Sequence, residues 1–92
     1  MAYLNRTTKQ WQEIDTKHHL HPFTDYKSLA EEGSIIVTNA DGVHLTTSDD
    51  KQLLDAMSGL WCVNVGYGQK NLAEVAYKQM QALPYYNSFF KS

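Results

Sequence analysis

The chain has 92 residues, which is at most one domain, and a fold of this size buries only about 60–65% of its unfolded surface. Leu, Ile, Val and Phe together make up 20 of the 92 residues, close to the level of about 20% at which a packed core becomes hard to form. The net charge of −2, from 8 basic and 10 acidic residues, is too small to indicate a disordered chain and gives no basic surface for nucleic acid.

The first predicted element is a helix that begins at Thr8. Residues on one side of it recur at helical spacing, namely Trp11, Ile14 and His18. Thr7 and Gln10 have the spacing of a capping box. Pro22 ends the helix, because a proline drives the preceding residue out of the α region. We expect the next stretch, HPFTDYKSL, to be irregular as far as Gly33.

Residues 34–56 are predicted to form a small antiparallel meander. SIIV (34–37) is apolar and β-branched, and NADG (39–42) is a turn signal. VHLTT (43–47) alternates apolar and polar positions, as a hairpin strand does. SDDK is a second turn, and QLLDAM (52–57) is the candidate third strand.

A second helix is predicted over residues 71–82, and Pro84 ends it. Its apolar residues fall on one helical face: Leu72, Val75, Ala76, Met80 and Leu83. Asn71 and Glu74 have the spacing of an N-cap and N3 pair. Together these elements give an α+β chain: an N-terminal helix, a small antiparallel meander and an amphipathic helix.

The stretch GLWCVNVGYGQ, residues 59–69, combines an apolar, aromatic run with three glycines. Gly66 and Gly68 look like part of a phosphate-binding loop, but position 71 is Asn where G-x-G-x-x-G needs glycine. We favour a sharp turn into the helix, and leave open a weak anion site at the helix N-terminus. Cys62 could be a nucleophile with a histidine base, but its apolar neighbours favour a buried, small apolar residue.

Three histidines in HHLH lie near two carboxylates: His18, His19 and His21, with Asp15 and Asp25. Imidazole and carboxylate groups can bind zinc. The spacing, however, matches no common zinc finger or zinc protease. We favour a solvated or hydrogen-bonded cluster without metal, and a metal-binding domain remains the weaker alternative.

The sequence PYYNSFFKS leaves four aromatic residues close to the C-terminus: Tyr85, Tyr86, Phe89 and Phe90. An exposed patch of this kind invites association. We expect the natural protein to continue beyond this point. The alternative is a small stand-alone interaction module that docks through these aromatics.

The single cysteine excludes an internal disulfide and fits a reducing compartment. No apolar run approaches the ~20 residues that span a bilayer, and no apolar signal segment follows Met1. We therefore expect a soluble, cytoplasmic protein.

Three motifs, HHLHPFTD, DAMSGLWCVNVGYGQ and QMQALPYYNSFF, occur in this order and spacing in one enzyme family. From about Thr8 to Lys91 the chain resembles the N-terminal segment of class III aminotransferases, which use pyridoxal 5′-phosphate (PLP). Among them it looks most like the ω-amino acid or amine–pyruvate transaminases, including the putrescine–pyruvate type. The resemblance implies that residues 1–92 are the N-terminal small-domain and interface segment of a longer catalytic domain with the α/β PLP-transferase fold type I.

The same resemblance implies six residues that wall a substrate pocket: Phe23, Leu60, Trp61, Cys62, Phe89 and Phe90. Phe89 and Phe90 would reach the active site of the other subunit, because sites in this family form at the interface of a homodimer. The expected ligands are a small amino donor, such as an ω-amino acid or diamine, and a keto acid, such as pyruvate. Nucleic acid and membranes are not expected partners.

No catalytic residue is expected in this chain. The resemblance places the cofactor-binding lysine, the aspartate beneath the pyridine nitrogen, the phosphate-binding loop and the carboxylate-binding arginine in later segments that have no match here. A cofactor-binding lysine needs a desolvated setting, whereas the seven lysines of this chain lie among polar neighbours or beside turns. One departure from the family pattern is the second turn, where Asp49, Asp50 and Lys51 replace the usual Asp-Gly or Glu-Gly.

Overall fold

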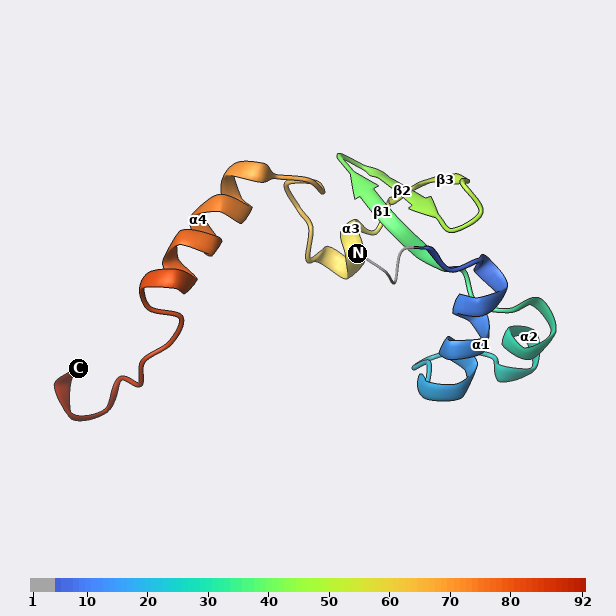
Figure 1. Cartoon of the computed structure of the whole chain (residues 1–92), viewed down its shortest axis with the longest axis horizontal. Coiled ribbons are helices and arrows are strands. Elements are labelled where there is room, and N and C mark those ends of the chain that lie inside the picture. The colour runs from blue at the N-terminus through green and yellow to red at the C-terminus, as the bar shows by residue number, and fades with distance from the viewer. Residues whose placement is uncertain (1–4) are drawn as a thin grey trace.

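The structure is a computed structural model that describes residues 5–92 (Figure 1). Its elements follow in chain order: α1 (Thr8–His18), α2 (Tyr26–Glu32), β1 (Val37–Asp41), β2 (His44–Thr47), β3 (Gln52–Leu54), α3 (Ser58–Trp61), α4 (Lys70–Ala82) and the 3₁₀ turn η2 (Phe89–Lys91). The α+β composition predicted from the sequence is confirmed, with one additional helix in α2 and a short helical turn in α3.

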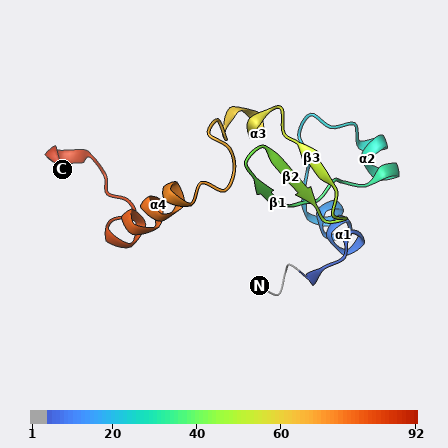
Figure 2. The same ribbon diagram turned by 90° about the horizontal axis from the view of Figure 1, so that it is seen from above.

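The chain is elongated, with extents of 55 × 29 × 29 Å. Its radius of gyration of 17.6 Å exceeds the roughly 12 Å of a compact domain of this length. Two views at right angles show α1, α2 and the sheet grouped at one end, while α4 and the C-terminal turn extend away from them (Figures 1 and 2). Among residues 5–92 no apolar side chain is fully buried.

Helix α1 begins as predicted. The Thr7 side chain accepts a hydrogen bond from the backbone N–H of Gln10 (3.3 Å), and the Gln10 side chain accepts one from the backbone N–H of Thr7 (2.9 Å). This reciprocal pair is a complete capping box, which satisfies two backbone donors that the helix leaves free. The Arg6 guanidinium lies over the ring of Trp11, 4.8 Å from its centre.

Helix α2 contradicts the expectation of an irregular segment before Gly33. Asp25 is its N-cap, and its carboxylate accepts hydrogen bonds from the backbone N–H groups of Lys27 (2.9 Å) and Ser28 (3.4 Å). The helix has seven residues and ends at Gly33, which has φ 78°. Two turns are too short for a clear apolar period, so the cap was the only available signal.

The predicted meander is confirmed as an antiparallel sheet in the order β1-β2-β3, but its first strand was misplaced. β1 runs over Val37–Asp41 rather than 34–37, and Asp41 pairs with His44. The connection is therefore a two-residue turn, with Gly42 at φ 56°, rather than the whole of NADG. A two-residue turn needs glycine at positive φ, and its flanking residues continue the ladder.

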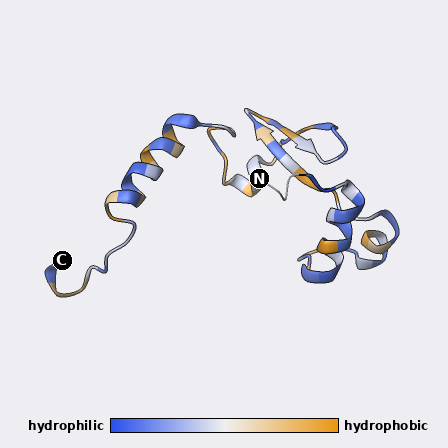
Figure 3. Cartoon of the chain, in the orientation of Figure 1, coloured by the Kyte–Doolittle hydropathy of each residue, from blue (hydrophilic) through white to orange (hydrophobic). Residues whose placement is uncertain are grey.

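Helix α4 covers the predicted range, but the predicted cap is wrong. Gln69 is the N-cap and makes no side-chain cap bond. Asn71 lies inside the first turn, and Glu74 instead pairs with Lys78, with 2.6 Å between Oε1 and Nζ. The predicted apolar face of α4 is uncovered, as Figure 3 shows by its orange segments, and Val75 and Met80 are about two-thirds exposed. No helix within the described residues is long and apolar enough to cross a membrane.

Candidate functional site

The short helix α3 is a left-handed turn. Four consecutive residues have positive φ: Ser58 (51°), Gly59 (57°), Leu60 (61°) and Trp61 (64°). The backbone N–H of Trp61 donates to the carbonyl of Met57 and that of Cys62 to Ser58, both at 3.0 Å. These are helical i→i−4 bonds in the wrong hand for L-residues, which costs about 1–2 kcal/mol for each residue other than glycine.

This turn presents its side chains outwards. Leu60 is 62% exposed and Trp61 is 77% exposed. The prediction that Cys62 is buried is wrong, because Cys62 is exposed and its Sγ lies 3.5 Å from the Leu60 carbonyl oxygen. The run around Cys62 is a surface turn rather than a core strand, so its apolar neighbours do not cover it. The chain thus holds two large apolar side chains in an unusual backbone conformation at the surface.

Asp55 is hydrogen-bonded to the left-handed turn, and the sequence analysis did not identify this residue. Its Oδ1 accepts a hydrogen bond from the N–H of Met57 (3.0 Å), and its Oδ2 accepts from the N–H of Gly59 (2.9 Å) and the hydroxyl of Tyr67 (2.7 Å). The Tyr67 hydroxyl is the main cause that lowers the pKa of Asp55, and the backbone N–H groups add to it. The carboxylate in turn raises the pKa of Tyr67.

Gly66 and Gly68 bring the chain against the β1–β2 turn. Tyr67 exchanges two backbone hydrogen bonds with Gly42, at 2.8 and 3.2 Å. A Cβ on Gly66 would lie 2.9 Å from the Gly42 carbonyl oxygen, and one on Gly68 would lie 2.9 Å from a carboxylate oxygen of Asp41. Both glycines have positive φ, 82° at Gly66 and 74° at Gly68, as the predicted sharp turn into the helix requires, and close approach is a second reason for them. A carboxylate at this position also opposes a bound phosphate.

Four of the six predicted pocket residues have a left-handed backbone, namely Phe23, Leu60, Trp61 and Phe90. Bulky residues rarely take positive φ, and strain of this kind concentrates at functional sites. Phe23 and Phe90 are also almost entirely exposed. The same conformation also occurs at Asp50, Ser58 and Lys91, so it marks these four residues as unusual without assigning them a role.

The structure does not bring the six residues together. Phe23 lies between α1 and α2, residues 60–62 lie in and just after α3, and Phe89 and Phe90 lie in η2. Phe89 and Phe90 contact each other edge to face, with ring centres 6.3 Å apart. Figures 1 and 2 place this end of the chain far from α1 and α2. Within the described residues, the candidates lie in three separate places and do not form a closed pocket.

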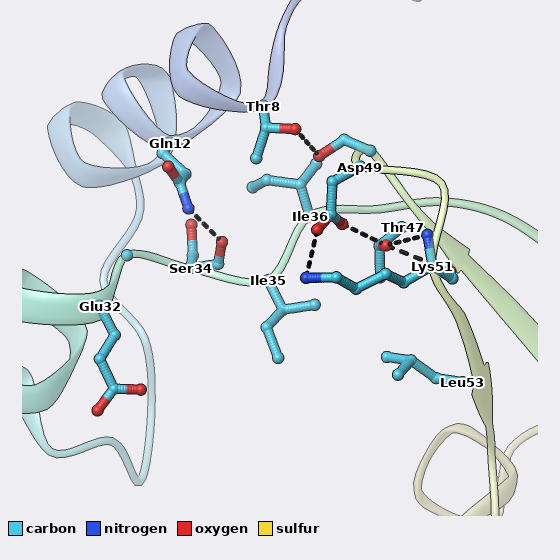
Figure 4. Close-up of a pocket in the computed structure, with 12 residues that line it drawn as sticks. Thr8, Gln12, Glu32, Ser34, Ile35, Ile36, Thr47, Asp49, Lys51 and Leu53 are labelled. Carbon is cyan, nitrogen blue, oxygen red and sulfur yellow. Dashed lines mark hydrogen bonds and ion pairs between the residues drawn. The ribbon is translucent and has the colours of Figure 1, made fainter.

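A hollow of about 270 Å³ between α1, the segment before β1 and the β2–β3 turn contains none of the six residues (Figure 4). The hydroxyls of Thr8 and Ser48 are hydrogen-bonded across it at 2.9 Å. Thr47, which is only 3% exposed, donates to Asp49 (2.6 Å), and Asp49 pairs with Lys51 (2.7 Å). At this hollow the Thr8–Ser48 bond connects α1 to the β2–β3 turn, and the other contacts hold the turn itself.

The second turn, where Asp49, Asp50 and Lys51 replace the usual Asp-Gly or Glu-Gly, lies in the same region. Asp50 takes φ 60°, the conformation for which the usual glycine is suited. Its backbone N–H donates to the Thr47 carbonyl at 3.0 Å. Lys51 holds the pKa of Asp49 below its ordinary value. The turn therefore forms without glycine.

The histidine cluster is a hydrogen-bonded pair with a ring contact. His21 Nε2 lies 2.7 Å from Asp15 Oδ2, and this bond is the main cause that lowers the pKa of Asp15. The rings of His19 and His21 meet edge to face, with centres 4.4 Å apart. Across residues 5–92 no group of three or more potential ligands could hold a metal ion.

The Aminotransferase class-III family profile matches residues 26–92. The chain belongs to the class-III aminotransferase family. It is 52% identical over 88 residues to the putrescine–pyruvate aminotransferase of Pseudomonas aeruginosa, covering 96% of this chain and 19% of that protein. The chain thus spans about a fifth of the length of this curated relative.

Solved transaminase structures share the arrangement of this class-III chain. An (S)-enantioselective ω-transaminase from Thermomicrobium roseum superposes with a TM-score of 0.85 at 35% identity, over 92% of this chain and 19% of that one. The ω-transaminase of Pseudomonas jessenii in complex with PMP has a TM-score of 0.79 at 30% identity, over 88% of this chain and 18% of that one. The resemblance to the class III family seen in the sequence is confirmed.

Class-III aminotransferases depend on PLP, and the described residues do not fit the anchoring of that group by themselves. All seven lysines are exposed, whereas an amine that attacks an aldehyde needs a lowered pKa. Lys51 shows the opposite, because Asp49 raises its pKa. The glycine loop before α4 faces the carboxylate of Asp41. The described residues therefore do not supply an attachment point for PLP.

Proposed function

We propose that residues 1–92 are the N-terminal segment of a PLP-dependent ω-transaminase that moves an amino group from a diamine or ω-amino acid to pyruvate. The observation that carries the proposal is the left-handed turn, in a chain of the class-III family, that exposes Leu60 and Trp61. The 52% identity to a putrescine–pyruvate aminotransferase favours an amine donor with pyruvate as acceptor. The single cysteine fits a reducing compartment and supports a cytoplasmic enzyme.

The role of this segment is to shape the substrate pocket and to exclude water from it. Ligand pockets are lined mainly by apolar and aromatic side chains, and Phe23, Leu60, Trp61 and Cys62 supply such surface. Phe89 and Phe90 supply it to the second subunit of a homodimer. PLP, when bound, supplies the electron sink. The residues of this chain orient the donor and exclude water from around it.

The proposal is tested in a chimera, in which residues 1–92 replace the matching segment of the P. aeruginosa putrescine–pyruvate aminotransferase. The chimera should form product from pyruvate and an amine donor. Trp61→Ala should change the ratio of kcat/KM between a short and a long diamine by about tenfold or more, because a group added to or removed from an apolar pocket discriminates on that scale.

Trp11→Ala is the matched control, because Trp11 is the other tryptophan of the chain and lies in α1 with the Arg6 guanidinium over its ring. It should lower the melting temperature of the chimera and leave the donor ratio unchanged. A Trp61→Ala chimera whose melting temperature collapses while the donor ratio stays constant would show that Trp61 is a core residue.

A further inference from the structure

We infer that Asp55 is the positioning residue of this site: its carboxylate, together with the Tyr67 hydroxyl, fixes the left-handed turn that presents Leu60 and Trp61. The inference rests on the proposed function, since it assigns the pocket wall a support. It does not depend on any residue outside this chain. Asp55 touches neither the donor nor the cofactor in this account, and it acts through the backbone of the turn.

The contacts of Asp55 hold the start of the left-handed turn in place. Its two carboxylate oxygens receive the N–H of Met57, just before the turn, and the N–H of Gly59, inside it. A carboxylate only accepts hydrogen bonds, and each of its two oxygens can accept about two of them. The two bonds tie the residue before the turn and a residue inside it to one side chain, and residues 58–61 keep positive φ there.

Asp55 and Tyr67 are themselves fixed by one element, the turn between β1 and β2. The backbone N–H of Asp55 donates to the Val43 carbonyl at 2.9 Å, and Tyr67 is bonded twice to Gly42. The 2.7 Å bond between the Tyr67 hydroxyl and Asp55 then joins the two supports. The geometry of the hairpin is thereby transmitted through two side chains to the backbone that carries Trp61.

The ionisation of both groups is consistent with this arrangement. The pKa of Asp55 is lowered by its donors, and the pKa of Tyr67 is raised by the carboxylate. At neutral pH Asp55 is an acceptor with full charge and Tyr67 keeps its proton as a donor. Charge-assisted hydrogen bonds of this type are stronger than neutral ones.

The test compares Asp55→Asn and Tyr67→Phe in the chimera. Asparagine keeps the shape of Asp55 but puts an NH₂ group or a single carbonyl toward donors that need two acceptor oxygens. Asp49→Asn is the matched control, because Asp49 is also a carboxylate that accepts from a side-chain hydroxyl and lies in a turn of the same sheet. None of the three substitutions changes side-chain volume greatly.

The first readout is hydrogen exchange of the peptide covering residues 56–63, measured by mass spectrometry. Asp55→Asn should speed the exchange of these amides by about tenfold or more, since the turn loses its acceptors. Tyr67→Phe should do so less strongly, and Asp49→Asn should leave this peptide unchanged. Unaltered exchange in Asp55→Asn would overturn the inference even in a fully active chimera.

The second readout is the donor ratio used for Trp61→Ala. Asp55→Asn should shift this ratio in the same direction as Trp61→Ala, by raising KM for the preferred amine more than it lowers kcat. The double variant of Asp55→Asn and Tyr67→Phe should cost no more than Asp55→Asn alone, because both act on one turn. A lowered melting temperature with an unchanged donor ratio would reduce Asp55 to a structural residue.

The two readouts separate the inference from the proposed function. If Trp61→Ala leaves the donor ratio unchanged while Asp55→Asn still speeds exchange, the proposed function fails and the support of the turn by Asp55 stands. If Trp61→Ala shifts the ratio and Asp55→Asn changes neither readout, the proposed function stands and the inference fails.

Discussion

Residues 5–54 and residues 58–92 are held in different ways. In the first region, short polar interactions fix one element on another: Thr8 bonds Ser48, Gln12 bonds the Ser34 carbonyl, and Thr47 joins the β2–β3 turn. Ser34 and Thr47, the buried residues of the described chain, both lie there. In the second region no residue is buried, and large apolar side chains stand on left-handed or helical backbone without cover.

The two regions of this small chain therefore keep their backbone geometry in different ways. The first region fixes its geometry through its own hydrogen bonds, which need little apolar surface. In the second region the turn at residues 58–61 is bonded to Asp55, which precedes the region and also accepts from Tyr67, but Leu60, Trp61 and the apolar face of α4 stay exposed. Such surface is what a binding pocket or an interface is built from.

The largest expected effect is the loss of transaminase activity when residues 1–92 are produced without the rest of the enzyme. Residues 1–92 alone should show no pyruvate-dependent transamination above background, whereas the chimera should be active. The reason is that all seven lysines are exposed and none has the desolvated setting that an attacking amine needs. The measurement is turnover with amine and pyruvate, together with borohydride reduction in the presence of PLP.

Stoichiometric labelling of one lysine, with measurable turnover, would contradict this expectation. Non-specific labelling without turnover agrees with it. If the C-terminal aromatics of this chain bind another protein and the chimera has no activity, the result would instead favour a stand-alone interaction module.

The second prediction concerns a substitution that removes hydrogen bonds from the first region. Thr47→Val in the chimera should lower stability by about 1–3 kcal/mol, because the Lys51 N–H and the Asp49 carboxylate lose their buried partner. Thr46→Val on the same strand is the control and should be nearly neutral. Chemical unfolding followed by tryptophan fluorescence measures both. Equal effects from the two substitutions would show that the polar joint contributes nothing of its own.

The third prediction addresses the second region at its far end. Phe89→Ala should change the donor ratio by severalfold with little effect on stability, since a large side chain at a pocket edge controls donor size. Tyr77→Ala, an exposed aromatic on α4, is the control and should leave the ratio unchanged. If both substitutions leave the ratio unchanged, Phe89 has no part in the pocket.

The smallest expected effect is a pH dependence of the turn. The pKa of Asp55 is lowered from 3.8, so its support is complete above that value and is lost as pH falls through the folded pKa. The pKa of Tyr67 is raised from 10.0, so its support is complete below that value and is lost as pH rises through the folded pKa. Protection of residues 56–63 should therefore be flat between about pH 5 and 9 after correction for intrinsic exchange.

Tyr67→Phe should lose the alkaline decline and keep the acid one. A decline of protection centred near neutral pH, present also in Tyr67→Phe, would mean that another group controls the turn.

The elements with a local signal were predictable from the sequence. The Thr7 and Gln10 capping box, the three-strand meander and the range of α4 all follow from patterns within a few residues, and the family resemblance followed from three motifs. The short helix α2 and the true start of β1 were missed, because two turns of helix and one glycine at a hairpin leave too little periodicity.

The left-handed turn could not be predicted from local residues. SGLW contains one glycine, and nothing in Leu60 or Trp61 favours positive φ. The turn is bonded to Asp55, three residues before it, which accepts from the N–H of Gly59 and from the hydroxyl of Tyr67, and Tyr67 reaches Asp55 only after two close backbone approaches. The role of the six pocket residues was inferred from the resemblance, and it stays a proposal.

The most direct measurement is a crystal structure of the chimera as a dimer with an amine donor or PMP bound. The account predicts that Trp61 and Leu60 lie within about 4 Å of the ligand or the cofactor, on a backbone that keeps positive φ at residues 58–61. It also predicts that Phe89 and Phe90 face the site of the partner subunit. A structure in which Trp61 faces solvent, or packs in a core away from the ligand, would contradict the central claim.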